Sequence, residues 1–187
     1  MKKRIIFALL AVVMVVTLAA CGAGNANKVD VESPVALIDS VWSTFAEEEK
    51  FPVMGGDFNT PVDGAAGKFD IADKENAVAT LHIAEDSIAL VDDVATLTHA
   101  MNANTFSAAA YHVADAKNTE TLVNSLKDSI KSTQWMCGFP DTLIIYTVGD
   151  DYVVAAFGNA EAIANFKTKL ATVYGEGAVL NVEEALV

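Results

Sequence analysis

The sequence predicts an α+β fold: a two-layer sandwich of a four-stranded, mostly antiparallel sheet with two packed helices, preceded by an N-terminal helix. The main observation is a repeated order of elements, β-β-α twice, between residues 93 and 175. The second is that 52% of the 187 residues are hydrophobic, which suits one domain with a real core and excludes disorder along most of the chain.

The first β-β-α unit begins with residues 93–101, where apolar and polar positions alternate with the period of a strand. Residues 102–105 (Asn-Ala-Asn-Thr) are a turn signal, and residues 106–113 form the returning strand. An amphipathic helix then begins at Asp115 or Asn118 and ends before the glycine and proline of the next loop.

The second unit repeats this order. Residues 143–148 are strongly β-prone, residues 149–151 (Gly-Asp-Asp) form the turn, and residues 152–157 return. An amphipathic helix follows and ends at Gly175. The tail holds a short strand at residues 178–182.

Before these units the chain is less regular. Ser33 is the expected N-cap of a helix over residues 34–48, which starts with proline. Residues 50–68 are rich in glycine and proline and predict an irregular loop. Asp73 is expected to cap a short helix that ends near residue 82, and residues 84–90 predict one helical turn.

Residues 1–20 have the form of a secretory signal. A basic start at residues 2–4 precedes an apolar run at residues 5–20, which is shorter than the roughly 20 residues of a spanning helix. The run ends in Leu18-Ala19-Ala20-Cys21. This order resembles the lipobox of bacterial lipoproteins.

The resemblance implies a lipid on the Cys21 sulfur and signal cleavage between Ala20 and Cys21. Two acyl chains anchor a protein stably, whereas one chain is marginal. The alternative is an ordinary secretory signal with a chance cysteine. On the lipoprotein interpretation, residues 21–32 are the lipidated cysteine and a flexible tether, and residues 33–187 form a single domain outside the cell membrane.

The net charge is −13, and removing residues 1–20, which hold three basic and no acidic residues, changes it to −16. Such a domain is a poor partner for nucleic acid, because phosphate binding depends on Lys and Arg. It is also repelled by an anionic leaflet, so we expect it to stand away from the membrane surface.

Few residues predict chemistry. Cys137 is the only thiol besides Cys21, and no C-x-x-C pair is present. His82, His99 and His112 lack the spacing of a metal site. A tight turn in the first hairpin would place His99 opposite Ala108 and His112 opposite Ala95, too far apart to share an ion. We therefore expect no catalytic group, cofactor or metal.

The segment before the second unit is the candidate partner-binding site, with Trp135, Cys137 and Phe139 as its residues; Trp42 is a further aromatic of this kind. The alternatives are that Cys137 is a small apolar residue packed under the helix end, and that the aromatic residues belong to the core.

A second resemblance covers about residues 35–175. Residues 101–106, 134–140 and 148–150 are similar to segments of uncharacterised lipoproteins of Gram-positive bacteria that carry a small α+β domain of unknown function. This resemblance implies no activity.

The sequence therefore predicts a membrane-anchored extracytoplasmic lipoprotein that serves as a binding or accessory module and is not an enzyme. Its expected partners are the membrane, through the lipid on Cys21, and an envelope protein. One alternative is a thiol-dependent or hydrolytic cell-envelope enzyme that uses Cys137 or a histidine. Another is a small-solute receptor, which is disfavoured because one compact domain lacks two lobes that could close.

Overall fold

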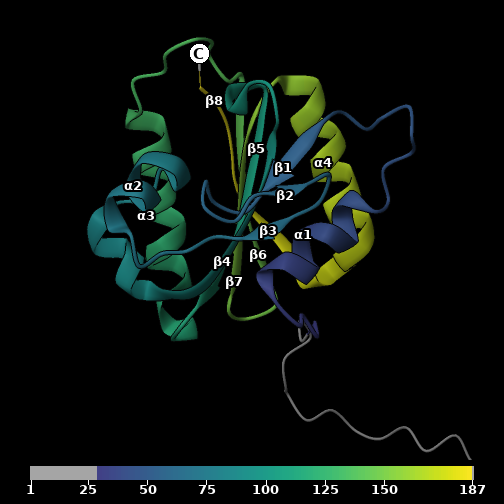
Figure 1. Cartoon of the computed structure of the whole chain (residues 1–187). Coiled ribbons are helices and arrows are strands. Elements are labelled where there is room, and N and C mark those ends of the chain that lie inside the picture. Colours follow the sequence, from purple (N-terminus) through teal and green to yellow (C-terminus); the bar gives the residue numbers. More distant parts are fainter. Residues whose placement is uncertain (1–28, 187) are drawn as a thin grey trace, which may run out of the picture.

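An antiparallel sheet of eight strands forms the centre of the part of the chain that the computed structural model describes, residues 29–186 (Figure 1). The predicted signal, the lipidation site at Cys21 and most of the tether lie outside these residues. The predicted α+β class is confirmed, whereas the four-stranded sheet and the two-layer arrangement are wrong.

The strands follow the order β2-β1-β4-β5-β7-β6-β8 across the sheet, and β3 pairs with β4. Their bounds are β1 (Val53–Gly55), β2 (Val62–Asp63), β3 (Gly67–Lys68), β4 (Val91–His99), β5 (Phe106–Val113), β6 (Thr142–Val148), β7 (Tyr152–Gly158) and β8 (Ala178–Ala185). The α-helices are α1 (Pro34–Trp42), α2 (Lys74–Leu81), α3 (Thr119–Ser132) and α4 (Ala160–Tyr174). Short 3₁₀ turns are η1 (Glu85–Leu90), η2 (Ala103–Thr105), η3 (Ala116–Asn118) and η4 (Gly175–Gly177).

The four central strands are the two predicted hairpins, and the predicted order β-β-α twice is confirmed. The additional strands come from segments with weak sequence signals. Three of them, β1 to β3, are two or three residues long and lie in the segment that was predicted to be an irregular loop. The tail strand β8 is longer than predicted and forms the edge beside β6.

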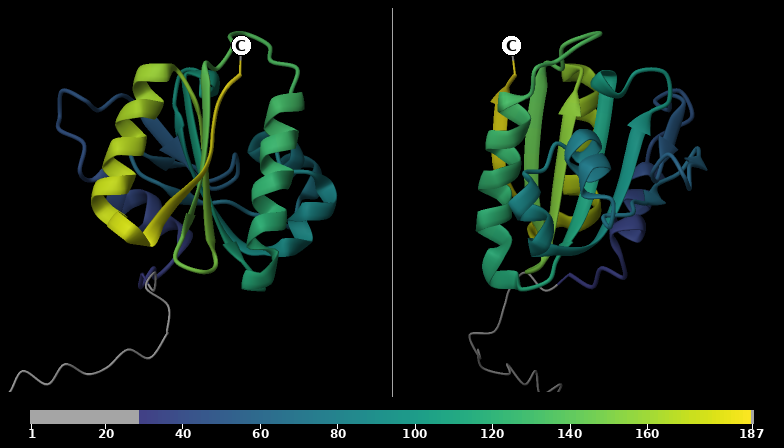
Figure 2. Two further views of the ribbon diagram at one scale, coloured as in Figure 1. Left: turned by 180° about the vertical axis from the view of Figure 1, so that it is seen from behind. Right: turned by 60° about the vertical axis from the view of Figure 1, so that its left-hand side comes forward.

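Helices cover both faces of the sheet (Figure 2). One core cluster joins the sheet to α1 and α4, and a second cluster on the other face joins it to α2 and α3. Strands between two helical layers are buried on both sides, and every residue of β7 is buried. The domain therefore has three layers.

The direction of the strands explains why α3 and α4 lie on opposite faces. The connection β5–α3–β6 passes over β7, and the connection β7–α4–β8 passes over β6, so both move the same way across the sheet. Their starting strands β5 and β7 are antiparallel. Because crossovers between parallel strands are right-handed, a reversed starting direction requires the opposite face.

Three capping residues predicted from the sequence mark the ends of helices in the structure. The hydroxyl of Ser33 accepts a hydrogen bond from the backbone N–H of Ala36, and the Asp73 carboxylate accepts one from Asn76. Both predicted N-caps are confirmed, as is the end of α4 at Gly175, whose φ is 52°.

Helix α1 is shorter than predicted, because it ends at Trp42 and not near residue 48. The hydroxyls of Ser43 and Thr44 donate to the backbone carbonyls of Ser40 and Val41 and so compete with helical hydrogen bonds. The acidic run that follows also opposes the helix dipole.

Candidate functional site

Exposed apolar side chains gather at one end of the sheet, where β4 turns into β5 and the loop from α3 enters β6. Of nine large hydrophobic residues exposed in the described chain, five belong to this end. We call these five the apical surface: Met54, Phe58, Met101, Met136 and Phe139. Their exposed fractions run from 40% to 85%, and such a concentration is typical of an interaction surface.

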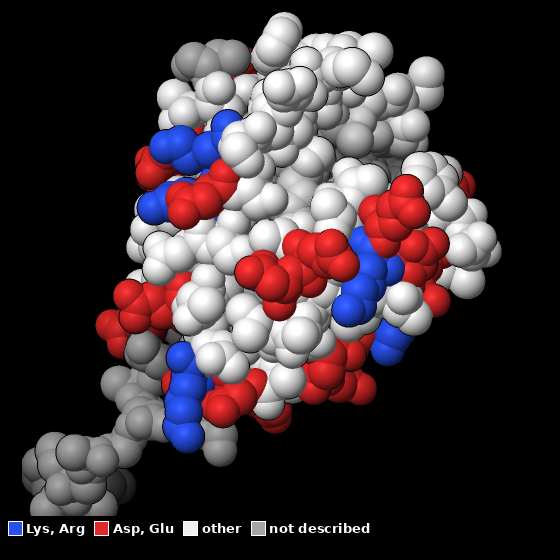
Figure 3. Space-filling model, turned by 90° about the vertical axis from the view of Figure 1, so that its left-hand side faces the viewer, with Lys and Arg blue, Asp and Glu red and all other residues white. Residues whose placement is uncertain are grey.

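The apical surface lies opposite the point where the described chain begins (Figure 1). Val31 accepts a hydrogen bond from the Tyr152 hydroxyl at the start of β7, which is the far end of the sheet from η2. On one face of the domain, charged residues also lie away from this end. Figure 3 shows red and blue patches across the middle and lower parts of one face, while its upper end is largely white.

Two asparagines of the β4–β5 turn hold the loop that carries Met136 and Phe139. The Asn102 side chain donates to the carbonyl of Cys137 at 3.2 Å. The Asn104 side chain donates to the carbonyls of Met136 and Gly138, both at 3.0 Å. Three consecutive carbonyls are thus fixed by amide donors, and we call these three hydrogen bonds the asparagine clamp.

The clamped loop presents two of the predicted partner-binding residues to solvent. Phe139 is 66% exposed. Cys137 is exposed as well, with a φ of 62°, so the interpretation of a thiol packed under the helix end is wrong. Trp135 is only half-buried, because it packs on His82 and Phe157 with ring centroids 5.0 Å apart in each pair. Trp42 belongs to the core, as its alternative interpretation predicts.

The three histidines lie in separate places. His82 is half-buried beside Trp135, and burial lowers its pKa. His112 contacts Asp92 and Asp151 at the end of the sheet remote from His99. The predicted hairpin register is wrong by two residues, since Leu97 and not His99 opposes Ala108, and Ala95 opposes Ala110 and not His112. The turn is centred one residue earlier than predicted, because Asn102 caps the 3₁₀ turn that follows it.

His99 occupies the centre of the apical end. Its Nδ1 accepts hydrogen bonds from the backbone N–H groups of Met101 and Asn102, at 3.1 and 3.3 Å. In the neutral ring this places the proton on Nε2. Phe51 stacks on the imidazole with ring centroids 5.3 Å apart. Within the described chain Nε2 has no hydrogen-bond partner, so it is a held donor available to a ligand.

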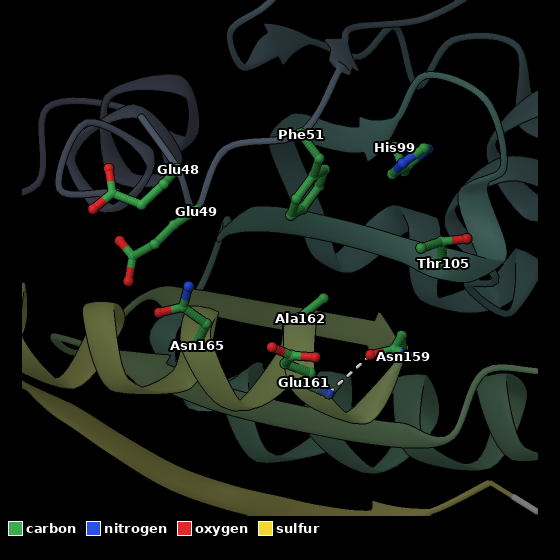
Figure 4. Close-up of a pocket in the computed structure, with 9 residues that line it drawn as sticks. All are labelled: Glu48, Glu49, Phe51, His99, Thr105, Asn159, Glu161, Ala162 and Asn165. Atoms are coloured by element: carbon green, nitrogen blue, oxygen red, sulfur yellow. Dashed lines mark hydrogen bonds between the residues drawn. The ribbon is translucent and has the colours of Figure 1, made fainter. Parts of the chain in front are cut away.

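His99 lines two hollows. The first, the acidic hollow, has a volume of about 530 Å³ and is drawn in Figure 4. It is lined by Glu48, Glu49, Phe51, His99, Thr105, Asn159, Glu161, Ala162 and Asn165. The second, the apolar hollow, has a volume of about 350 Å³ and lies between β1, the following loop and the β4–β5 turn. Met54, Phe58 and Met101 line it together with glycine and threonine residues.

The carboxylates of the acidic hollow differ in their partners. Glu49 pairs with Lys169 at 2.8 Å, and the hydrogen bonds from Lys169 and from the backbone of Ala46 hold the pKa of Glu49 below its usual range. Glu48 and Glu161 are exposed and form no ion pair within the described chain. No described Lys or Arg lines either hollow, so both admit a positive group without displacing one of the protein's own.

The loop that carries Phe58 is built on a buried carboxylate. Asp57 is 6% exposed and accepts hydrogen bonds from the backbone N–H groups of Asn59, Thr60 and Asp70, at 2.7 to 3.0 Å. The bonds from Asp70 and then Thr60 lower the pKa of Asp57. The carboxylate oxygens of Asp57 therefore fix the conformation of the loop, and in this conformation the Phe58 side chain is exposed to solvent.

Within residues 29–186, no group of three or more His, Cys, Asp or Glu side chains has the arrangement of a metal site. The same residues contain no helix with the length and apolar character needed to cross a membrane. No protein-family model, curated protein or solved structure matches this chain.

Sequence reasoning found Cys137 and Phe139 but missed the rest of this end, namely Phe58, the three methionines and His99 as a donor. The sequence nevertheless contains a signal that could have identified the methionines. All three methionines beyond residue 28 are in turns, loops or a three-residue strand, where a core-filling methionine is not expected.

Proposed function

We propose that this protein is a membrane-anchored extracytoplasmic binding module, held to the outer face of the cell membrane by a lipid on Cys21. On this proposal the apical surface, and not a catalytic centre, performs its role. The observation that carries the proposal is the concentration of exposed apolar side chains on one end of an otherwise charged domain.

The position of that end supports the proposal. The described chain begins at the end of the sheet opposite the apical surface. The seven residues between Cys21 and Val29 span at most roughly 25 Å when fully extended. An anchor at Cys21 would therefore hold the opposite end toward the membrane and direct the apical surface outward, toward other proteins of the envelope.

Anchoring is tested by replacing Cys21 with serine and fractionating cells of the native host. We expect Cys21→Ser protein to leave the membrane fraction or to stay at precursor mass. Cys137→Ser is the matched control and stays membrane-bound at mature mass. Cys21→Ser protein of mature mass in the membrane fraction would refute the lipid anchor.

Docking is tested by photo-crosslinking in intact cells. A photoreactive phenylalanine derivative at position 101 or 139 is expected to give a discrete crosslinked partner. The same group at position 180, an exposed leucine on the edge strand β8, is the control and is expected to give none. Equal crosslinking at positions 101 and 180 would refute the assignment of the apical surface.

The exposure of Cys137 favours one second candidate, the thiol-dependent enzyme. Such an enzyme normally activates its thiol with a neighbouring base. Among the described residues no imidazole hydrogen-bonds to Cys137, which supports the binding module instead. A thiol probe that reacts with Cys137 much faster than with glutathione at pH 7 would reverse this preference.

A further inference from the structure

His99 lines both the acidic hollow and the apolar hollow, so the two are neighbours and a single extended ligand is the simplest common occupant. We propose that this ligand is a basic, apolar polypeptide segment, which places a Lys or Arg side chain in the acidic hollow and an apolar side chain in the apolar hollow. The inference rests on the proposed function and names the chemistry of the partner.

The negative charges around the acidic hollow favour a basic side chain of this segment. Glu48 and Glu161 have no ion-pair partner in the described chain, and they belong to different elements of its lining, one to the loop after α1 and the other to the first turn of α4 (Figure 4). No described Lys or Arg lines the hollow, so the charged side chains around it favour a cation over an anion. The net charge of −13 further favours the approach of basic partners.

The exposed side chains of the apical surface favour a polypeptide over a small amine as the ligand. A small cation would fill the acidic hollow and leave all five apical residues in water. Three of those five are methionines, and methionine is flexible and polarisable, which lets a surface adapt to varied apolar side chains. The exposed area is therefore suited to a chain that continues beyond one hollow.

His99 supplies a contact between the two ends of such a segment. Its ring is fixed by two backbone N–H groups and by stacking on Phe51, and its Nε2–H has no partner in the described chain. A donor held between an acidic and an apolar hollow matches a backbone carbonyl that lies between a basic and an apolar side chain. A purely aliphatic ligand would leave this donor unused.

The test measures the binding of three labelled synthetic peptides to the full chain in zwitterionic detergent by fluorescence anisotropy. The peptides alternate Lys with Leu, Lys with Ser, and Glu with Leu. We expect the Lys-Leu peptide to bind most tightly and the Glu-Leu peptide not to bind. Binding is expected to weaken as salt is raised, because the basic part acts by charge.

Matched variants locate the peptide. Glu48→Gln with Glu161→Gln is expected to raise the Kd of the Lys-Leu peptide about fivefold, near the upper range for exposed ion pairs. Glu120→Gln, in the first turn of α3, is the control for Glu161 and is expected to change nothing. Met101→Gln is expected to raise the Kd about tenfold, whereas Leu180→Gln does not.

Each contrary result has a distinct meaning. No binding of the Lys-Leu peptide, or equal binding of the Glu-Leu peptide, overturns the inference. Equal binding of the Lys-Ser peptide, with full competition by butylamine, replaces the polypeptide by a small-cation site. If the yield of crosslinks from position 101 in cells is unchanged in Glu48→Gln with Glu161→Gln protein, only the inference is overturned. Loss of position-specific crosslinks in the otherwise unmodified protein refutes the proposed function itself.

Discussion

Replacing Asn104 with aspartate tests whether the asparagine clamp holds the loop that carries Met136 and Phe139. The two side chains have the same shape, but aspartate cannot donate a hydrogen bond when it is ionised. The change removes the bonds to the carbonyls of Met136 and Gly138, and it sets carboxylate oxygens against carbonyl oxygens that are now 3.0 Å from the amide nitrogen.

The magnitude follows from the number of bonds lost. Each intramolecular hydrogen bond contributes about 1 kcal/mol, and these bonds are exposed, so the closed loop should lose roughly 1 to 2 kcal/mol relative to its open form. Since 1.4 kcal/mol is a factor of ten, the open population should rise about 5- to 30-fold. The rest of the domain should keep its stability, because the clamp lies outside both core clusters.

Limited proteolysis with chymotrypsin measures the open population, because Trp135 supplies a cleavage site beside the clamped carbonyls, whereas Phe139 precedes Pro140 and is not cut. We expect Asn104→Asp protein to be cut there 5- to 30-fold faster with an unchanged Tm. Asn124→Asp, on the exposed side of α3, is the matched control. Cleavage at the wild-type rate, or a Tm that falls in parallel with faster cleavage, would refute the clamp as a local device.

Two further predictions concern the sheet. Gly67→Ala should lower the free energy of unfolding in urea by about 2 kcal/mol, because a Cβ there would lie 2.4 Å from the backbone nitrogen of Gly56; unchanged stability would show that the strands can separate freely. Burial alone would lower the pKa of His112, but hydrogen bonds and charge from Asp92 and Asp151 outweigh it and raise the pKa. The contribution of protonated His112 to the free energy of unfolding is therefore fully present below about pH 6.5 and is lost as pH rises through the folded-state pKa. His112→Asn should lower the free energy of unfolding in urea most at pH 5.5 and least at pH 9. A loss that does not change with pH would contradict the ion pairs.

The helices and the hairpins were predictable because their signals are local. Ser33, Asp73 and Gly175 act through bonds or dihedral angles within a few residues of themselves. The strands β1 to β3 could not be predicted in the same way. They are held by a close approach of two glycine-containing segments, where a Cβ on Gly55 would lie 2.2 Å from the backbone nitrogen of Gly67. Such an approach depends on residues that are 12 positions apart in the sequence and meet only in the folded sheet.

The three-layer arrangement depends on neighbours that no hairpin signal specifies. Only the adjacency of β5 and β7 fixes the antiparallel starting directions that send α3 and α4 to opposite faces. One sequence observation did bear on it. Residues 152–157 are apolar at every position, a run that is typical of strands buried on both faces and not of a strand with one solvent face.

The apical end shows why its parts could be recognised separately but not as one site. Residues 101–106 and 134–140 each stood out in the sequence, yet nothing in either segment states that they meet. The asparagine clamp joins them, since the side chains of Asn102 and Asn104 find their partners more than 30 positions away. Asparagine in a turn is usually explained by its own backbone bonds, and Asn102 makes one of these as well. When the amide nitrogen of a turn asparagine also donates a hydrogen bond to a distant loop, the side chain fixes that loop as well as its own turn. The exposed Met136 and Phe139 are therefore held in place by the same turn that presents Met101, and this arrangement favours a preformed binding surface over a loop that orders only on contact.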